Sequence, residues 1–408
     1  MVNYVPSMGV LIVTNRCGSN CEICGNSSPR NGDLPEHEMQ SFIDQAYDLG
    51  IKWIEFSGGE PLLRKDSVLK FAAYARSKGM ESGLTTSSCT YSDRNEAYSA
   101  PVELKDAGIK VMDFSLDKFH QDHVPYENVL AGVEGALFAD MDKINIRSIN
   151  TKSTKNETRQ LINRLAGDIG GIIRDKYIEW NGKKMRVRRI EANREGKARN
   201  IDKSDFVTYY VEDEEIACSA DDITIMSNGD LVPCCSFCNF SNEFYHMGNI
   251  RNTSLEEFIK KVNESPLDIM FSPIGFGRIK RFLEKSDNER IRNLASDDYS
   301  FLCEFCSNVM TSPTLEYLED EIKKHPKEPQ LLFREVKGGQ KVTVVSNGNE
   351  TNILDYMGPL CSRDFWIEST TQRIKELDKR ERNEERDEFR KKLEHVLERA
   401  RKIKKWQD

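Results

Sequence analysis

Three cysteines within one short segment, Cys17, Cys21 and Cys24, constrain this chain more than any other feature. They follow an apolar segment at 8–14, MGVLIVT, that predicts a buried strand. Glycine and polar residues separate them, which is typical of a loop and not of a core stripe. Three thiolates in one loop can hold an iron–sulfur cubane, which four cysteines normally saturate. The next cysteine, Cys89, is too far along the chain for the same loop, so we predict one open iron that can bind a substrate or cofactor.

The cysteine count and the bulk composition also favour metal binding in a reducing compartment. The chain has 408 residues and eleven cysteines, and a length of this order suggests two or three domains or one large barrel with additions. No signal peptide and no apolar run long enough for a transmembrane helix is visible, so we expect a cytoplasmic protein. Thiols stay reduced there, which favours metal ligands over disulfides. The formal net charge of -8 does not suggest a general nucleic-acid or membrane surface.

Strand-like and helix-like patterns alternate through the first part of the chain. The predicted strands span 8–14, 53–58, 83–87, 111–116, 143–149 and 185–191. The predicted helices span 35–49, 66–78, 102–108, 126–139 and 156–174. This alternation predicts a parallel α/β architecture, in which ligands bind at the C-terminal ends of the strands. The pattern alone does not distinguish an open sheet from a closed or partial barrel.

The cysteine spacing CxxxCxxC after a first strand resembles the signature of the radical S-adenosylmethionine (SAM) superfamily. The resemblance implies that Cys17, Cys21 and Cys24 hold a SAM-binding [4Fe–4S] cluster on a partial (β/α)6 TIM-like barrel. The family often has an aromatic residue just before the third cysteine, where this chain has Ile23. This departure leaves the ligands unchanged.

Further matches to the family follow the other predicted strands. Gly58, Gly59 and Glu60 resemble the family's GGE motif, which implies contact with the methionyl amine of SAM. The resemblance extends to Thr85, Thr86 and Ser87 near SAM, Ser115 and Asp117 on the ribose side, Asn150 and Thr151 after the fifth strand, and Gly196 and Ala198 behind the adenine. His120 and His123 suit acid–base chemistry, but also a helix entry or a solvent-facing position. We therefore assign no catalytic acid or base.

A second set of cysteines supplies four thiolates, enough to close another metal site. An Asn-Gly turn signal between the first two would bring them onto neighbouring strands, and the last two form a CxxC pair. The predicted ligands are Cys218, Cys234, Cys303 and Cys306. The CX10GX4C half resembles the SPASM extension of the family, and the lack of a further cysteine run resembles its shorter twitch version with one auxiliary [4Fe–4S] cluster. A structural zinc suits the same thiolates, and Cys235, Cys238 and Cys361 are left unassigned.

Changes of pattern divide the chain into three predicted regions. These are a radical SAM core barrel at 1–200, a small cysteine-rich α+β extension at 201–320, and a C-terminal extension at 321–408. The last region contains a predicted hairpin with Gly-Gly and Asn-Gly turn signals, and then a highly charged helical tail. Apolar residues recur along that tail at Phe389, Leu393, Val396, Ala400 and Ile403. The tail either docks on its own domain or associates with a partner or a second copy.

The resemblance implies an activity but leaves the substrate open. A reduced cluster would cleave SAM to a 5′-deoxyadenosyl radical, which would abstract a substrate hydrogen, and a partner such as flavodoxin or ferredoxin would supply the electron. The SPASM/twitch-type extension favours oxidative modification of a ribosomally made peptide. The alternative is a small-molecule dehydrogenase, for a sugar or cyclitol-like substrate, with the auxiliary cluster as electron acceptor. A non-enzymatic scaffold or sensor is a third hypothesis, against which the intact cysteine and GGE motifs argue.

Overall fold

The computed structural model describes most of the chain up to residue 324 and three short strands beyond it. The described residues are 4, 6–25, 32–208, 222–235, 242–265, 275–295, 299–324, 332–333, 343–346 and 349–352. Cys218, Cys238, Cys361 and the whole predicted charged tail lie outside these ranges. No helix among the described residues is both long and apolar enough to cross a membrane.

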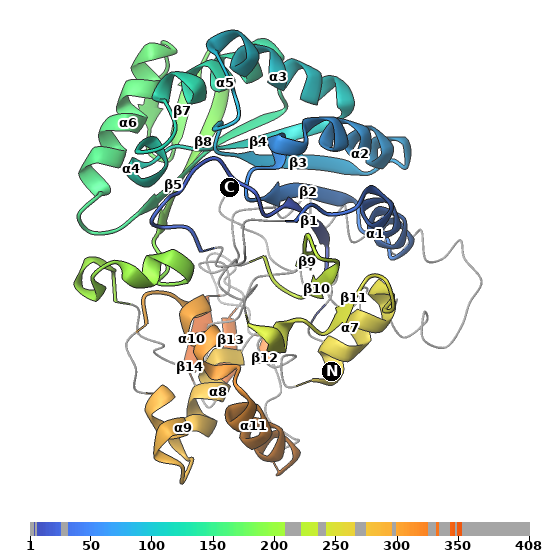
Figure 1. Ribbon diagram of the computed structural model, residues 1–408. Coiled ribbons are helices and arrows are strands. Elements are labelled where there is room, and N and C mark those ends of the chain that lie inside the picture. Colours follow the sequence, from blue (N-terminus) through green and yellow to red (C-terminus); the bar gives the residue numbers. More distant parts are fainter. Residues whose placement is uncertain are drawn as a thin grey trace.

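A parallel sheet forms the centre of the fold, and it contains all six predicted strands (Figure 1). These strands are β1 (Met8–Thr14), β2 (Trp53–Gly58), β3 (Glu81–Thr86), β4 (Ile109–Ser115), β5 (Lys143–Asn150) and β8 (Lys183–Glu191). They pair side by side in the order β1-β2-β3-β4-β5-β8, each parallel to its neighbour. The sheet continues beyond both β1 and β8 and does not close on itself, which confirms the predicted partial barrel.

Helices connect consecutive strands and cover the outer face of this sheet (Figure 1). They are α1 (Glu36–Asp48), α2 (Lys65–Ser77), α3 (Arg94–Ala107), the short α4 (Lys118–Gln121), α5 (Tyr126–Phe138) and α6 (Lys155–Asp168). The five longer helices each present an apolar stripe to the sheet; α1, for example, buries Met39, Phe42, Ile43 and Ala46 in the main core. The short α4 instead buries Phe119 against Cys21 and Ile23. Burial of these stripes supplies the hydrophobic stabilisation that holds helices and sheet together.

Two helix boundaries differ from the prediction, and local chemistry explains both. The segment predicted at 102–108 closes helix α3, whose start at Arg94 was not predicted; Asp93 caps its first turn by accepting from two backbone N–H groups. It ends as predicted at Gly108, whose φ of 119° is left-handed. Helix α6 ends at Asp168 and not at 174, and Gly170, with φ of 72°, turns the chain. A hairpin that the sequence did not predict follows, with β6 (Ile172–Arg174) and β7 (Tyr177–Trp180) antiparallel to each other.

The cysteine-rich extension joins the main sheet at the free edge of β1. Strand β9 (Asp222–Ile225) pairs parallel with β1, and β10 (Asp230–Val232) and β11 (Gly248–Asn249) continue from it antiparallel. Gly229, with φ of 86°, makes the predicted turn between β9 and β10. The same sheet therefore carries both cysteine-bearing regions.

Helices complete the extension. The first, α7 (Leu255–Glu264), packs in the main core, whereas α8 (Gly275–Glu284), α9 (Glu289–Leu294), α10 (Leu302–Val309) and α11 (Ser312–Lys324) enclose a second apolar core. Aromatic rings fill the centre of this core, where Phe305 packs edge-on against Phe276 and Tyr299. The strands β12 (Leu332–Phe333), β13 (Thr343–Ser346) and β14 (Asn349–Asn352) form a small antiparallel sheet, and the turn predicted at Asn347-Gly348 lies outside the described residues.

Candidate active site

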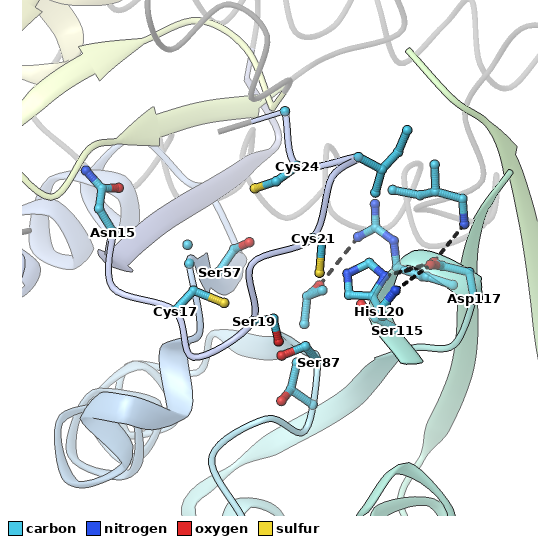
Figure 2. A pocket seen from close by; sticks show the side chains of 18 residues that line it. Asn15, Cys17, Ser19, Cys21, Cys24, Ser57, Ser87, Ser115, Asp117 and His120 are labelled. Atoms are coloured by element: carbon cyan, nitrogen blue, oxygen red, sulfur yellow. Dashed lines mark hydrogen bonds and ion pairs between the residues drawn. The ribbon is translucent and has the colours of Figure 1, made fainter. Parts of the chain in front are cut away.

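A cavity of about 200 Å³ opens at the C-terminal ends of β1 to β5, where the sequence predicted the ligand site. Figure 2 shows its lining, with the loop that follows β1 curving across one side. Ten predicted site residues line it: Cys17, Cys21, Cys24, Gly58, Gly59, Thr85, Thr86, Ser87, Ser115 and Asp117. The other predicted contacts of the barrel, all described, lie outside this lining: Glu60, Asn150, Thr151, Gly196 and Ala198.

The loop that carries the three cysteines is held against the end of β2 by backbone hydrogen bonds. Gly59 N–H donates to Thr14 O over 2.7 Å, and Glu60 N–H donates to Arg16 O over 2.8 Å. A Cβ atom at Gly58 would lie 2.4 Å from Thr14 O, and one at Gly59 would lie 2.2 Å from Arg16 O. Both positions therefore require glycine. The sequence attributed these glycines to a close approach of backbone to ligand, but the close approach seen is that of β2 to the cysteine loop.

Glu60 lies behind the cavity wall and fastens the end of β3 to it. Its side chain is fully buried, and its carboxylate accepts four hydrogen bonds, from Leu62 N–H, Thr86 O–H, Ser87 N–H and Ser87 O–H. Thr86 and Ser87 themselves line the cavity. Burial raises the pKa of Glu60 to about 7, with a further rise from the nearby thiolate of Cys89, although the hydrogen bonds oppose it.

Cys89 is a fourth thiol beside the cysteine loop that the sequence did not predict. A Cβ atom at Gly18 would lie 3.3 Å from Cys89 Sγ, and the side chains of Cys17 and Cys89 hydrogen-bond to each other. The hydrogen bond with the Cys17 thiol lowers the pKa of Cys89 to about 5. Sequence separation hid this contact, because only the fold brings the end of β3 next to the loop after β1.

Asp117 and His120 form the polar wall on the β4 side of the cavity. The carboxylate of Asp117 caps α4 by accepting from His120 N–H, and it accepts from Ile149 N–H of β5 as well. His120 Nδ1 lies 2.9 Å from both carboxylate oxygens. Burial lowers the pKa of His120, but the charge and hydrogen bond of Asp117, with the charges of Glu60 and Cys89, together outweigh it, and the net pKa is raised. His120 lines the cavity, whereas His123 is exposed on the outer side of the turn.

Gly196 packs on the cysteine loop from the side of β8. It opens a 3-10 turn at Gly196–Asn200, and the next residue, Lys197, donates its N–H to Cys24 O over 3.0 Å and its ammonium to Asn20. The φ of Gly196 is 55°, and a Cβ atom there would lie 2.4 Å from Gly25 O and 2.6 Å from Cys24 O. Gly196 therefore packs directly against the backbone of the cysteine loop at Cys24 and Gly25.

We expect Gly196→Ala to push the cysteine loop out of place. The new Cβ must displace backbone and not a flexible side chain, so we expect a loss of about 1–3 kcal/mol in unfolding free energy and a lower iron content after reconstitution. Gly182→Ala is the matched control, because Gly182 also has positive φ (81°) but has open space around it. Thermal unfolding and iron analysis measure both effects. Equal losses in the two variants would show that backbone strain alone, and not the contact with the loop, is responsible.

The second cysteine set is brought together in part. Cys234 follows β10, and Cys303 and Cys306 lie in the first turn and a half of α10. Burial raises the pKa of Cys306 well above its ordinary value, and the charges of Cys234 and Cys303 raise it further. The phenol of Tyr245 lies 2.7 Å from Cys306 Sγ and opposes that rise. Within the described ranges, no three His, Cys, Asp or Glu side chains are spaced like the ligands of a bound ion.

Two family models match the chain over these two regions. Residues 11–164 match the radical SAM superfamily, and residues 218–307 match SPASM, an iron–sulfur cluster-binding domain. This chain belongs to the radical SAM superfamily. The two matches cover the cysteine loop with the barrel strands around it, and the second cysteine set with its helices.

Curated relatives of this radical SAM protein include cyclases that its sequence matches at low identity. "GTP 3′,8-cyclase" of Campylobacter jejuni is 25% identical over 273 residues, which are 58% of this chain and 81% of that protein. "Probable GTP 3′,8-cyclase" of Methanothermobacter marburgensis is 29% identical over 147 residues, 34% of this chain and 46% of that protein.

The solved structures to which this chain is similar include two with peptides bound. One is anSMEcpe with bound AdoMet and a peptide, at 12% identity, a TM-score of 0.48, and coverage of 78% of this chain and 98% of that one. Another is SuiB of Streptococcus suis with the precursor peptide SuiA, at 15% identity, a TM-score of 0.39, and coverage of 73% and 74%. Scores this low say nothing about the substrate of this chain.

The cofactors of this radical SAM enzyme are SAM and [4Fe–4S] clusters, including an auxiliary cluster. The cavity fits such an assembly in two respects. Three thiols, the ligand type that iron–sulfur clusters use, share one cavity. In addition, Asn15 lines the cavity and is 8% exposed, and its Oδ1 has no hydrogen-bond partner within the described chain, so it can accept from a ligand donor.

Proposed function

We propose that this enzyme oxidises a ribosomally made peptide by abstracting a hydrogen atom from it. The SPASM match together with the clustering of Cys234, Cys303 and Cys306 carries this proposal, because a second cluster could accept the electron left on the substrate. The reaction takes place in the cytoplasm, with flavodoxin or ferredoxin as reductant. Oxidation of a small molecule, such as a sugar or cyclitol, is the second candidate, and the likeness to GTP cyclases, whose named substrate is a small molecule, favours it.

The proposed ligand sets follow from where the thiols lie. Cys17, Cys21 and Cys24 hold the SAM-binding cluster. The auxiliary cluster takes Cys234, Cys303 and Cys306, with Cys218 as the fourth ligand from outside the described residues. When bound, the first cluster supplies an electron that cleaves SAM to methionine and a 5′-deoxyadenosyl radical, which abstracts the substrate hydrogen.

The protein side chains around the cavity position SAM in this proposal. Asn15 Oδ1 accepts from the methionyl ammonium, Glu60 attracts that ammonium through its charge from behind the cavity lining, and Ser115 and Asp117 face the ribose. A bound ammonium favours the ionised form of Glu60, which burial otherwise disfavours. Asp117 is itself fixed by Ile149 N–H and by the first turn of α4, so it adds little flexibility to the site.

We expect Glu60→Gln to weaken SAM binding by about tenfold, because an amide cannot accept all four hydrogen bonds that hold the end of β3. In the wild type, SAM binding should strengthen as pH rises from 6 to 8, since the carboxyl of Glu60 ionises at about 7 and only its ionised form attracts an ammonium. Titration of the cluster-loaded protein with SAM at several pH values measures both effects. Glu81→Gln, at the opposite end of β3, is the control. If the affinity for SAM depends on pH in the same way in Glu60→Gln as in the wild type, Glu60 does not contribute to SAM binding.

The peptide substrate is tested by anaerobic turnover with peptides encoded beside this gene. The proposal predicts a peptide product that has lost two hydrogen atoms, formed together with 5′-deoxyadenosine. If the peptides stay unmodified and a sugar or cyclitol is oxidised in the same assay, the second candidate replaces the first.

A further inference from the structure

A layer of charged side chains lies inside the partial barrel, directly below the cavity. Glu55 comes from β2, Asp113 from β4, Arg147 from β5 and Arg188 from β8. They lie on one face of the sheet, because Arg188 reaches Asp113 across the intervening strand β5. Arg147 also lines the cavity and lies 3.4 Å from Thr85 Oγ1, another lining residue. Arg147 therefore connects the charged layer to the active-site cavity, and Glu55, Asp113 and Arg188 lie behind its lining.

Contacts within this layer leave the two arginines incompletely paired. Asp113 Oδ2 lies 3.5 Å from Arg147 and 3.4 Å from Arg188, longer than the roughly 2.7–2.9 Å of a strong charge-assisted hydrogen bond. Its other oxygen, Oδ1, accepts from Asn145 over 2.6 Å. Arg188 is 8% exposed, and its Nε has no hydrogen-bond partner within the described residues. A buried guanidinium normally has all its N–H groups bonded.

Charge in the layer is also unbalanced toward the positive. Glu55 is held by Thr85 and by Trp53, and burial raises its pKa to about 8, with a further rise from Asp113. The carboxyl group of Asp113 lies within 4 Å of both guanidiniums. Burial, and next the positive charge of Arg147, lower the pKa of Arg188, which shows that the two cations repel each other.

We propose that Arg147 and Arg188 bind an anionic group of the substrate, a carboxylate or a phosphate, on the floor of the barrel. Guanidinium groups match the planar or tetrahedral oxygens of both anions. The bound anion would complete the hydrogen bonding of Arg188 and balance the charge beside Asp113. This inference rests on the proposed function: in a peptide the group is an Asp or Glu side chain or the C-terminal carboxylate, and in the small-molecule case it is a carboxylate or phosphate.

Direct binding to the cluster-loaded protein, with SAM present at saturation, tests this subsite without turnover. The probes are glutarate, its neutral analogue glutaramide, and inorganic phosphate, each followed by calorimetric titration. We expect saturable binding of glutarate or phosphate and none of glutaramide. Whichever anion binds more tightly shows whether the subsite is for a carboxylate or for a phosphate. Arg147→Gln and Arg188→Gln should each weaken anion binding by about tenfold or more when each variant is measured at a SAM concentration that saturates it. Arg189→Gln, on the exposed face of β8, should bind like the wild type.

Any of three results would overturn the inference. The first is that no anion binds saturably while SAM is bound, and the second is that both arginine variants bind the anion as tightly as the wild type. The third is that the variants lose anion binding only because they no longer bind SAM. If Arg188→Gln fails to fold, Arg147→Gln still tests the subsite. The side chain of Arg147 is 34% exposed, so the fold tolerates its replacement more easily. Because binding is measured without a peptide, a failure of the peptide hypothesis leaves this result standing.

Discussion

Alanine at Cys17, Cys21 or Cys24 is expected to abolish both the SAM-binding cluster and the release of 5′-deoxyadenosine, whereas Cys89→Ala should keep both. Three thiolates are needed to hold a cubane whose fourth iron binds SAM, so the loss of any one leaves two. Cys89 lies beside Cys17 but does not line the cavity, and a fourth thiolate there would fill the open iron. We therefore assign Cys89 no ligand role during turnover.

Iron and sulfide analysis after anaerobic reconstitution, in a background that lacks the auxiliary cluster, measures this difference. Single loop variants should fall to background iron, and Cys89→Ala should retain about four irons per chain. The proposed ligand set would be contradicted if Cys89→Ala lost the cluster while an alanine variant at Cys17, Cys21 or Cys24 kept it.

Cys303→Ala or Cys306→Ala is expected to remove the auxiliary cluster and stop product formation, while SAM cleavage continues. Both residues lie on α10, which is separated from the cysteine loop of the barrel and packs in its own aromatic core. The thiolate loss removes about four irons per chain and removes the proposed acceptor for the substrate electron. Peptide product should become undetectable, and 5′-deoxyadenosine should still form.

Cys235→Ala is the matched control for these variants, because its side chain is the exposed neighbour of Cys234. It should retain both clusters and full product formation. Iron content, zinc content and product are measured on the same preparations. Bound zinc in place of iron in the wild type, or unchanged product in Cys303→Ala, would contradict an oxidative role for the second site.

Local periodicity was sufficient to predict the parallel strands, and the family resemblance carried by the cysteine spacing supplied the partial barrel. Alternating strand and helix patterns located all six parallel strands, and the cysteine spacing located the loop after β1. The start of α3 was missed because its first turns hold only small buried residues, Ala97 and Ala100, and Pro101 lies inside the helix. The β6–β7 hairpin was missed because its strands are three and four residues long, too short for a period to emerge.

The features that the sequence could not predict depend on contacts between distant segments. The approach of Cys89 to Cys17 and the charged layer below the cavity exist only once parallel strands place residues far apart in the chain on one face. The glycines of the GGE motif show the same limit. Their position was predicted, but the contact with the loop backbone that requires them becomes visible only in three dimensions.

The most direct test of the central claim is anaerobic incubation of the cluster-loaded wild-type protein with SAM and dithionite. If the cavity beside Cys17, Cys21 and Cys24 holds a cluster with an open iron, 5′-deoxyadenosine and methionine should appear in equal amounts, and Cys24→Ala should form neither. Intact SAM after incubation of a wild-type protein with full iron content would contradict the claim.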